Sequence, residues 1–429
     1  MRGEGVYLWD ENGKRYLDFC SSAVVNFIGH GVGEIADAMA AQAKQLEFVH
    51  SSQFTTPVAE EYASELLAFA GPNFAGGRIF FTSGGSEAIE TALKLARQYQ
   101  VEIGHPERYQ TFSRKQSYHG ATLGALAVSG NQRRRLMYFP MVREFTHVGT
   151  PYCYRCAYDC TDGCRNCGLD YAAELDHALE RANCEAAAFI FEPVSGATLG
   201  AVVPPPGYLQ EVADVCRKHH ALLIADEVMT GIGRTGRNFA VDHWDVAPDI
   251  LVTAKGLSSG YAPLGAVIAT KRVADAIANG SGTFVHGFTY NCHPVSLAAG
   301  RAVLGYLQAH SLVRAADSGV VGTPADELKT LLAALRDLPC VGDVRGIGLL
   351  WAVEFVADKK TKQPLAVEHN FAAKVAEAAM KRGVLVYPMQ GCADGTAGDH
   401  VLIAPAAVIT HGDLQFGIEK LREAINDLG

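Results

Sequence analysis

The sequence predicts an α/β protein, with a large, mostly parallel β-sheet flanked by helices and a smaller α+β domain built from both termini. Apolar runs occur at residues 186–191, 221–225 and 250–252, and such runs are typical of buried parallel strands. Segments with helical spacing alternate with the strands, which is the pattern of strand–helix–strand units. Beyond residue 308 helices surround longer extended stretches, and this indicates a second domain.

Three segments follow from this pattern. They are the N-terminal part of the small domain (1–49), the large domain (50–308) and the C-terminal part of the small domain (309–429). Near the N-terminus, Asn12 and Gly13 lie between the predicted strands 7–10 and 14–19, and an Asn-Gly pair there favours a tight hairpin turn. The other expected elements are helices at 34–46, 59–69, 87–98, 325–335 and 370–381, a strand at 78–82, and extended segments at 344–355 and 384–387.

Charge and hydropathy argue against several classes of protein. The formal net charge is −9 and no basic block occurs, which argues against nucleic acid as a partner. No uninterrupted run of about 18 apolar residues and no long apolar N-terminal segment is present, so no membrane partner and a cytoplasmic location are expected. Most of the cysteines, such as Cys20, Cys184 and Cys216, stand singly in apolar surroundings, which suits buried reduced thiols.

Lys255 is the first candidate for chemistry. It follows the apolar strand 250–252 and begins a loop that Gly256 and Gly260 bracket, so it should lie at the carboxyl end of a strand. Ligands of open α/β sheets bind outside these ends, and burial disfavours the ammonium form of a lysine. An amine that loses its proton near neutral pH can attack a carbonyl. For this stretch alone, the alternative is a surface lysine after a strand.

Two acids and an anion site follow other strands. Asp226 and Glu192 each come directly after a predicted apolar strand. Residues 83–86 join a strand to the start of a helix, where glycines let backbone N–H groups approach an anion. The structural alternatives are a helix N-cap for Asp226 and a plain loop acid for Glu192.

An amine, an acid and an anion site are the groups that pyridoxal phosphate requires, for its aldehyde, its ring nitrogen and its phosphate. Several motifs that contain or adjoin these residues occur in order, namely YLWDENGKRYLDF, SGGSEAIETALKLAR, SYHG, FEPVSG, ADEVMTGIGRTG, the loop around Lys255, and HGFTYNCHP. By this ordered set the chain, from about Gly5 to the C-terminus, resembles the class III pyridoxal-phosphate-dependent aminotransferases, the group that contains ω-amino acid and amine transaminases. The resemblance implies fold type I of the pyridoxal phosphate enzymes.

The resemblance also implies roles for the site residues. Lys255 and Asp226 are the catalytic residues, because Lys255 binds the cofactor covalently and moves a proton, and Asp226 pairs with the ring nitrogen. The other cofactor contacts are Gly85 and Ser86 at the phosphate, Tyr118 stacked on the ring with His119 beside it, Glu192 near Asp226, Val228 on the opposite ring face, and Thr289 at the phosphate of the neighbouring subunit. A buried core tyrosine is the alternative for Tyr118. The role of Thr289 implies a homodimer with shared active sites.

The implied reaction is a ping-pong transfer of an amino group from an amine or ω-amino acid to a keto acid or aldehyde. A pyridoxal-phosphate-dependent aminomutase, racemase or decarboxylase is the alternative, because the same cofactor residues serve all of these reactions. A further alternative is an inactive scaffold with a metal-binding cysteine loop, against which the intact set of Lys255, Asp226 and Tyr118 argues.

One departure from the family bears on the substrate. Many relatives that act on α-amino carboxylates carry an arginine where Leu402 aligns, and the loop 391–400 contains no arginine either. Without a guanidinium that pairs with a carboxylate through two hydrogen bonds, tight binding of an α-carboxylate is harder. We therefore expect a plain amine, or a donor whose amine is remote from a carboxylate. Arg345 could supply the charge, but a structural role is favoured for it.

A second departure is a cysteine-rich loop with Cys153, Cys156, Cys160, Cys164 and Cys167. Two C-x-x-C pairs could hold zinc as four thiolates, but the gap between them is shorter than usual and a fifth cysteine intervenes. Redox chemistry and a solvent-side loop of thiols without a metal are the alternatives. No metal ligand is included in the predicted site.

Overall fold

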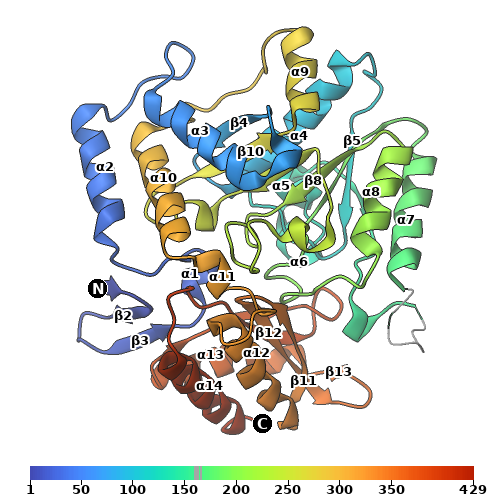
Figure 1. Ribbon diagram of the computed structural model, residues 1–429. Coiled ribbons are helices and arrows are strands. Elements are labelled where there is room, and N and C mark those ends of the chain that lie inside the picture. The colour runs from blue at the N-terminus through green and yellow to red at the C-terminus, as the bar shows by residue number, and fades with distance from the viewer. Residues whose placement is uncertain (159–163, 165–166) are drawn as a thin grey trace.

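The large sheet positions the site. The computed structural model describes residues 1–158, 164 and 167–429, and within these residues seven strands form this sheet in the order β4-β10-β9-β8-β7-β5-β6 (Figure 1). The strands are β4 (Arg78–Thr82), β10 (Gly265–Ala269), β9 (Ile250–Thr253), β8 (Leu222–Asp226), β7 (Ala186–Phe191), β5 (Gln110–Arg114) and β6 (Thr146–Val148). The pairings from β9 to β6 are parallel, whereas β10 is antiparallel to both neighbours. The predicted mostly parallel sheet is confirmed.

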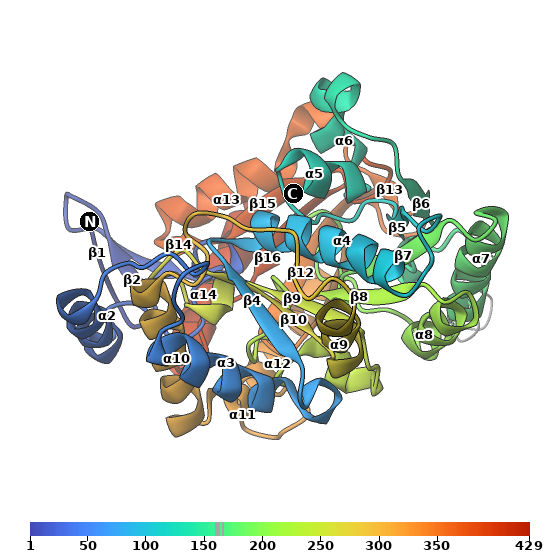
Figure 2. The ribbon, with the colours of Figure 1, turned by 90° about the horizontal axis from the view of Figure 1, so that it is seen from above.

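Side chains of the central strands alternate between two helical layers. In β8, Leu222 and Ile224 pack into one apolar cluster, while Leu223 and Ala225 pack into a larger one. The first cluster lies under α4 (Gly85–Glu102), α5 (Leu123–Val128) and α9 (Lys271–Asn279), and the second under α3 (Pro57–Ala70), α7 (Cys167–Arg181), α8 (Tyr208–Lys218) and α10 (Pro294–Ala309). Figure 2 shows α4 and α10 on opposite sides of the sheet. Because both faces are covered, these strands are apolar throughout.

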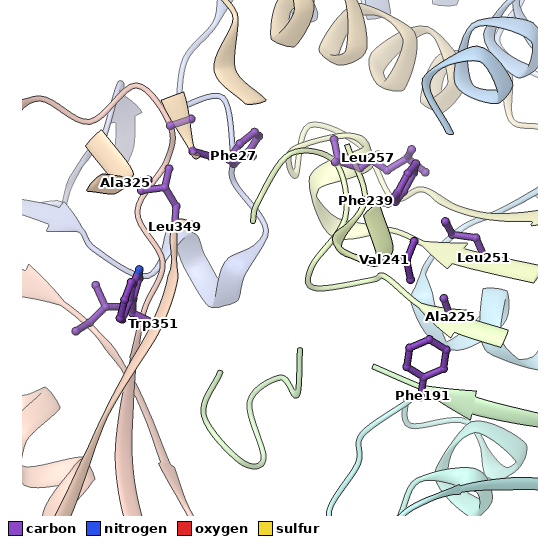
Figure 3. Close-up of a cluster of buried hydrophobic side chains, with 14 of the residues drawn as sticks. Phe27, Phe191, Ala225, Phe239, Val241, Leu251, Leu257, Ala325, Leu349 and Trp351 are labelled. Carbon is purple, nitrogen blue, oxygen red and sulfur yellow. The ribbon is translucent and has the colours of Figure 1, made fainter. Parts of the chain in front are cut away.

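The larger cluster reaches the carboxyl ends of the central strands. Figure 3 shows Phe191, Ala225 and Leu251, which lie on neighbouring strands, together with Phe239 and Val241 from the connection after β8. All five side chains are buried. This packing fixes the strand ends that precede the predicted site residues.

Strands from both ends of the chain pair in a second, smaller sheet. Its order in the described residues is β1-β2-β3-β14, with β1 (Arg2–Glu4), β2 (Tyr7–Trp9), β3 (Arg15–Asp18) and β14 (Val384–Leu385). The predicted hairpin joins β2 to β3, and the Asp10 N–H donates to the Lys14 carbonyl at 3.1 Å across the turn. Gly13 adopts φ +79°, which suits glycine in such a turn. The four-residue turn α1 (Ser21–Val24), whose residues have positive φ, and the 13-residue helix α2 (Gly33–Gln45) follow.

The C-terminal part forms a third sheet, called here the C-terminal sheet. Within the described chain its path is β11-β12-β16-β15, and β13 pairs with β12. Its elements are β11 (Val341–Ile347), β12 (Leu350–Asp358), β13 (Gln363–Pro364), β15 (Tyr387–Gln390) and β16 (Asp399–Ile403), with the helices α12 (Pro324–Ala333), α13 (Phe371–Lys381) and α14 (His411–Asn426) beside them. Together with the pairing of β3 and β14, this confirms a smaller α+β unit built from both termini (Figure 1).

Some expected elements differ in the structure. The extended segment 344–355 is interrupted at Gly348, whose φ of +61° reverses the chain between β11 and β12. The segment 384–387 is divided between two sheets. The connection from β8 to β9, expected to resemble a strand–helix–strand unit, contains only the 3-10 helix η4 (Ala240–Trp244).

Cys20 and Cys216 are buried as predicted, but Cys184 is exposed, because it lies in the turn after α7.

Among the helices of residues 1–158, 164 and 167–429, none combines the length and the apolar character needed to cross a membrane.

Candidate active site

A cavity of about 470 Å³ lies at the carboxyl ends of β7, β8 and β9. The predicted residues that line it are Gly85, Ser86, Tyr118, His119, Glu192, Asp226, Val228 and Lys255. They come from five different places along the chain, and the order of the sheet brings them together. Because β7, β8 and β9 are adjacent and parallel, Glu192, Asp226 and Lys255 meet at one edge.

Lys255 begins a short 3-10 turn, η5 (Lys255–Leu257), after β9. Its φ is +44°, and a non-glycine residue in this left-handed region costs roughly 1–3 kcal/mol. Burial lowers the pKa of the Lys255 amine from 10.5 to about 8, although the carboxylates of Asp226 and Glu192 raise it in part. A substantial fraction of this amine is therefore unprotonated, and thus nucleophilic, at mildly alkaline pH.

Asp226 ends β8 and is held at both carboxylate oxygens. Its Oδ2 lies 2.7 Å from His119 Nδ1, and its Oδ1 accepts a hydrogen bond from the Val228 N–H at 3.0 Å. Asp226 and His119 are both buried. The imidazole and the Val228 N–H fix the plane of the carboxylate, which lines the cavity.

Glu192 and Tyr118 are connected through a loop after β5. The Glu192 carboxylate accepts hydrogen bonds from the backbone N–H groups of Gly196, at 2.9 Å, and Tyr118, at 3.4 Å. Burial raises the pKa of the Glu192 carboxyl. Glu192 thus holds the backbone of Tyr118, whose side chain lines the cavity.

The start of α4 forms a cradle for an anion. Helix α4 is 18 residues long, and its first residues Gly85 and Ser86 line the cavity. A Cβ atom on Gly85 would lie 3.1 Å from Val228 Cγ1, and one on Gly120 would lie 2.7 Å from Ser86 Oγ. Larger residues would therefore displace Val228 or Ser86, and glycine at these positions keeps the start of α4 in place. Ser86 Oγ also accepts a hydrogen bond from the Ala121 N–H at 3.0 Å.

Thr289 lies apart from the other predicted residues. In the single chain it is exposed, in the segment between α9 and α10, and it does not line this cavity. Cys160 of the cysteine-rich loop lies outside the described residues.

Two site features could not be recognised in the sequence. One is the hydrogen bond between His119 and Asp226, since SYHG alone does not show which side chain the imidazole meets. The other is Arg134, whose guanidinium carbon lies 4.5 Å from the centroid of the Tyr118 ring and whose charge lowers the pKa of Lys255. Arg134 belongs to the basic run 133–135, which was the available signal.

Arg345 and Leu402 take structural positions. Arg345 pairs with Glu354 at 2.6 Å and with Asp343 at 3.2 Å, and it donates to the carbonyl of Gly200 at 2.6 Å. These contacts occupy the guanidinium, as expected for a structural arginine. Leu402 is fully buried in β16.

The chain is similar to known proteins over its whole length. Residues 1–425 match the family model for aminotransferase class-III. An uncharacterized aminotransferase of Bacillus subtilis (strain 168) is 40% identical over 425 residues, which are 98% of this chain and 93% of that protein.

Solved structures agree with this similarity. An amine transaminase from an uncultivated Pseudomonas species, in its PLP-bound form, has a TM-score of 0.91 and 35% identity and covers 100% of this chain and 94% of its own. A thermostable (S)-enantioselective omega-transaminase from Thermomicrobium roseum has a TM-score of 0.90 and 38% identity. The match covers 100% of this chain and 92% of that protein's chain.

Proposed function

Because this chain belongs to the class-III aminotransferases, we propose that it uses pyridoxal 5'-phosphate to move an amino group from an amine or ω-amino acid to a keto acid or aldehyde. The observation that carries the proposal is the cavity into which Lys255, Asp226 and the start of α4 all face. An amine with a pKa of about 8, a fixed carboxylate and an anion cradle match the aldehyde, ring nitrogen and phosphate of this cofactor.

The residues that line the cavity carry the groups that the cofactor requires. When bound, pyridoxal phosphate supplies an aldehyde that reacts with amines and a ring that accepts electron density. Lys255 would hold it covalently, and Asp226, fixed by His119, would face the ring nitrogen. Gly85 and Ser86 would bind the phosphate at the start of α4, where backbone N–H groups and the helix dipole favour an anion.

Lys255 also carries the proton transfer. The same amine would remove a proton from the carbon that bears the donor's amino group and then return the proton to a neighbouring atom. The lowered pKa of Lys255 suits both removal and return of a proton near neutral pH. One cavity serves the donor and then the acceptor, so the donor's product leaves before the acceptor binds. This order gives ping-pong kinetics.

The cavity walls favour donors without an α-carboxylate. Besides the polar residues, the cavity is lined by apolar side chains, among them Val25, Val194 and Leu264. Arg345 is already paired with acids. Arg134, beside Tyr118, forms no ion pair within the described part of the chain, so a carboxylate remote from the reacting amine has a cation to meet there.

A donor panel tests this proposal. The visible absorption of the purified, cofactor-loaded protein should bleach when 1-phenylethylamine or an ω-amino acid is added without acceptor, and turnover should require an added keto acid or aldehyde. Alanine, glutamate and aspartate should bleach it more slowly, because no arginine is among the described residues that line the cavity. A wide preference for one of these three would contradict the substrate class. Turnover without any acceptor would favour an aminomutase, racemase or decarboxylase.

We also propose a homodimer in which Thr289 binds the cofactor phosphate of the partner subunit. Thr289 is exposed between two exposed apolar side chains, Val285 (79%) and Tyr290 (60%). The Tyr290 ring lies 5.6 Å from that of Phe48, and Phe54 nearby in sequence is 63% exposed. These apolar groups support a surface that a second copy covers.

A mixed dimer tests whether Thr289 acts across the interface. Thr289→Ala alone should weaken cofactor binding about tenfold, the effect of one lost hydrogen bond to a charged group. In a dimer of one Lys255→Ala chain and one Thr289→Ala chain, one site should have both residues intact and bind cofactor with wild-type affinity. Cofactor titration of purified mixed dimers measures this. If no site of the mixed dimer binds the cofactor with wild-type affinity, Thr289 acts in the site of its own subunit.

A further inference from the structure

The cysteine-rich loop brings three sulfurs together outside the lining of the cavity described above. Cys153 lies in the 3-10 helix η3 (Cys153–Arg155), Cys167 begins α7, and Cys164 lies between them. Their Sγ atoms are all within 4.8 Å of one another. Four sulfurs bound to zinc at about 2.3 Å stand about 3.8 Å apart, so these thiols need only a small inward shift to reach that spacing.

A fourth sulfur, that of Cys156, lies near Cys153, outside the group of three. Cys156 interacts electrostatically with the Cys153 thiol, and its Sγ accepts a hydrogen bond from the Tyr171 hydroxyl at 3.8 Å. Cys153 and Cys156 form one C-x-x-C pair, and Cys164 and Cys167 form a second. Two such pairs meeting in space are the ligand arrangement of structural zinc sites.

The surroundings favour a metal over reactive thiols. Cys164 Sγ donates to the Cys153 carbonyl and Cys167 Sγ to the Cys164 carbonyl, both at 3.6 Å, which are weak hydrogen bonds. Cys167 is buried and Cys153 and Cys164 are partly buried, and a metal ion removes the protons of thiols that it binds.

The geometry points to one Zn²⁺ held by the thiolates of Cys153, Cys156, Cys164 and Cys167, and we propose this as a structural metal site. Each thiol releases its proton to solvent as the sulfur coordinates the metal. No step of amino transfer involves this site.

The proposed metal would fasten a connection between the large sheet and the C-terminal sheet. Arg155, two residues after Cys153, pairs with Glu354 of β12 through Nε at 2.7 Å. Lys362 donates to the Tyr154 carbonyl at 2.8 Å from the same side. Cys167 lies on α7, which packs against the large sheet. Zinc would therefore join the start of α7 to the loop that contacts β12.

Metal analysis of the holoenzyme tests the proposal. Protein purified without a polyhistidine tag and under reducing conditions should contain about one zinc per chain, measured by mass spectrometry of the metal. Cys164→Ser and Cys167→Ser should lower the zinc content roughly tenfold or more, because each removes one of four ligands. Cys184→Ser, which changes an exposed cysteine outside the cluster, should leave it unchanged.

A second measurement is independent of whether the variants fold. Wild-type protein freed of zinc by a chelator should bind one Co²⁺ with the intense visible absorption of a tetrahedral thiolate site, and should melt several degrees lower until metal is restored. The proposal is overturned if the wild-type protein holds no zinc and binds none when it is added. It is equally overturned if the Cys164 and Cys167 variants keep their zinc, or if a mass two hydrogens lighter shows a disulfide among these cysteines in the reduced preparation.

Discussion

Lys255→Ala is expected to lower kcat for amino transfer by roughly four orders of magnitude, the upper range for removal of a general acid–base group. The variant loses both the amine that would hold the cofactor and the only described side chain at the cavity that is placed to attack an aldehyde. The purified variant should also lack the visible band of covalently held cofactor. Lys271→Ala, at an exposed lysine paired with Asp275, is the matched control and should change neither.

The pH dependence follows from the lowered pKa of Lys255. Cofactor loading requires the unprotonated amine, so its rate should rise as the pH increases through about 8. In the cofactor-free protein, the folded-state pKa is about 8 and the unfolded value about 10.5. The stability contributed by this group is therefore present above the unfolded value and is lost as the pH falls through about 8.

A stability measurement distinguishes this role from a surface role. At pH 7 the cofactor-free Lys255→Ala variant should be more stable than the cofactor-free wild type by roughly 1–3 kcal/mol, because it no longer buries an ammonium. Thermal melts of both proteins at pH 7 and pH 10 measure the difference, which should shrink at the higher pH. A variant that remains active, or a stability difference from the wild type that is the same at both pH values, would mean that Lys255 is a solvated lysine after a strand.

Sequence reasoning placed Lys255, Asp226 and Glu192 at one edge of the sheet because each follows an uninterrupted apolar run. Such runs are a local signal of strands. Because neighbouring parallel strands end at the same edge of a sheet, the residues that follow them are expected to lie together. The small residues at 83–86 are a local signal in the same way, since their backbone N–H groups can approach an anion at the start of a helix.

Features that depend on distant contacts could not be predicted in this way. His119 and Asp226 are 107 residues apart, and no local pattern specifies their 2.7 Å contact. Gly348 interrupts an apolar segment that reads as one strand, and only the fold shows that a Cβ there would lie 2.5 Å from the Thr235 carbonyl carbon. The proximity of Arg134 to the Tyr118 ring depends likewise on how α6 (Gln132–Arg135) packs.

Asp226→Asn is expected to lower kcat by about two to three orders of magnitude, the range for removal of one preorganised electrostatic contact. The amide keeps one oxygen to accept from the Val228 N–H, so the fold should persist. It cannot carry the negative charge that would keep the cofactor ring protonated. Steady-state kinetics with a saturating donor and cofactor measure the loss in kcat, and circular dichroism verifies the fold.

The neighbouring acid provides a matched control for this experiment. Glu227 is also buried, and burial raises the pKa of its carboxyl from 4.5 to about 7. Its carboxylate accepts hydrogen bonds from the Thr230 hydroxyl and from the Val241 N–H, and it does not line the cavity. Because a glutamine keeps one oxygen to accept from the Val241 N–H and its amide group can donate to the Thr230 hydroxyl oxygen, Glu227→Gln should leave kcat within about twofold of the wild type.

The two acids should differ in stability as well as in activity. A folded pKa above the unfolded one means that the contribution of Glu227 is fully present below pH 4.5 and is lost as the pH rises through about 7. Glu227→Gln should therefore raise the melting temperature relative to the wild type at pH 8 more than at pH 6. Equal losses of kcat in the Asp226→Asn and Glu227→Gln variants would contradict a specific role for Asp226, because they would show that any change to a buried acid at this strand end disturbs the site. A loss confined to Asp226→Asn would instead assign the effect to its charge, since the two substitutions remove the same group from adjacent positions.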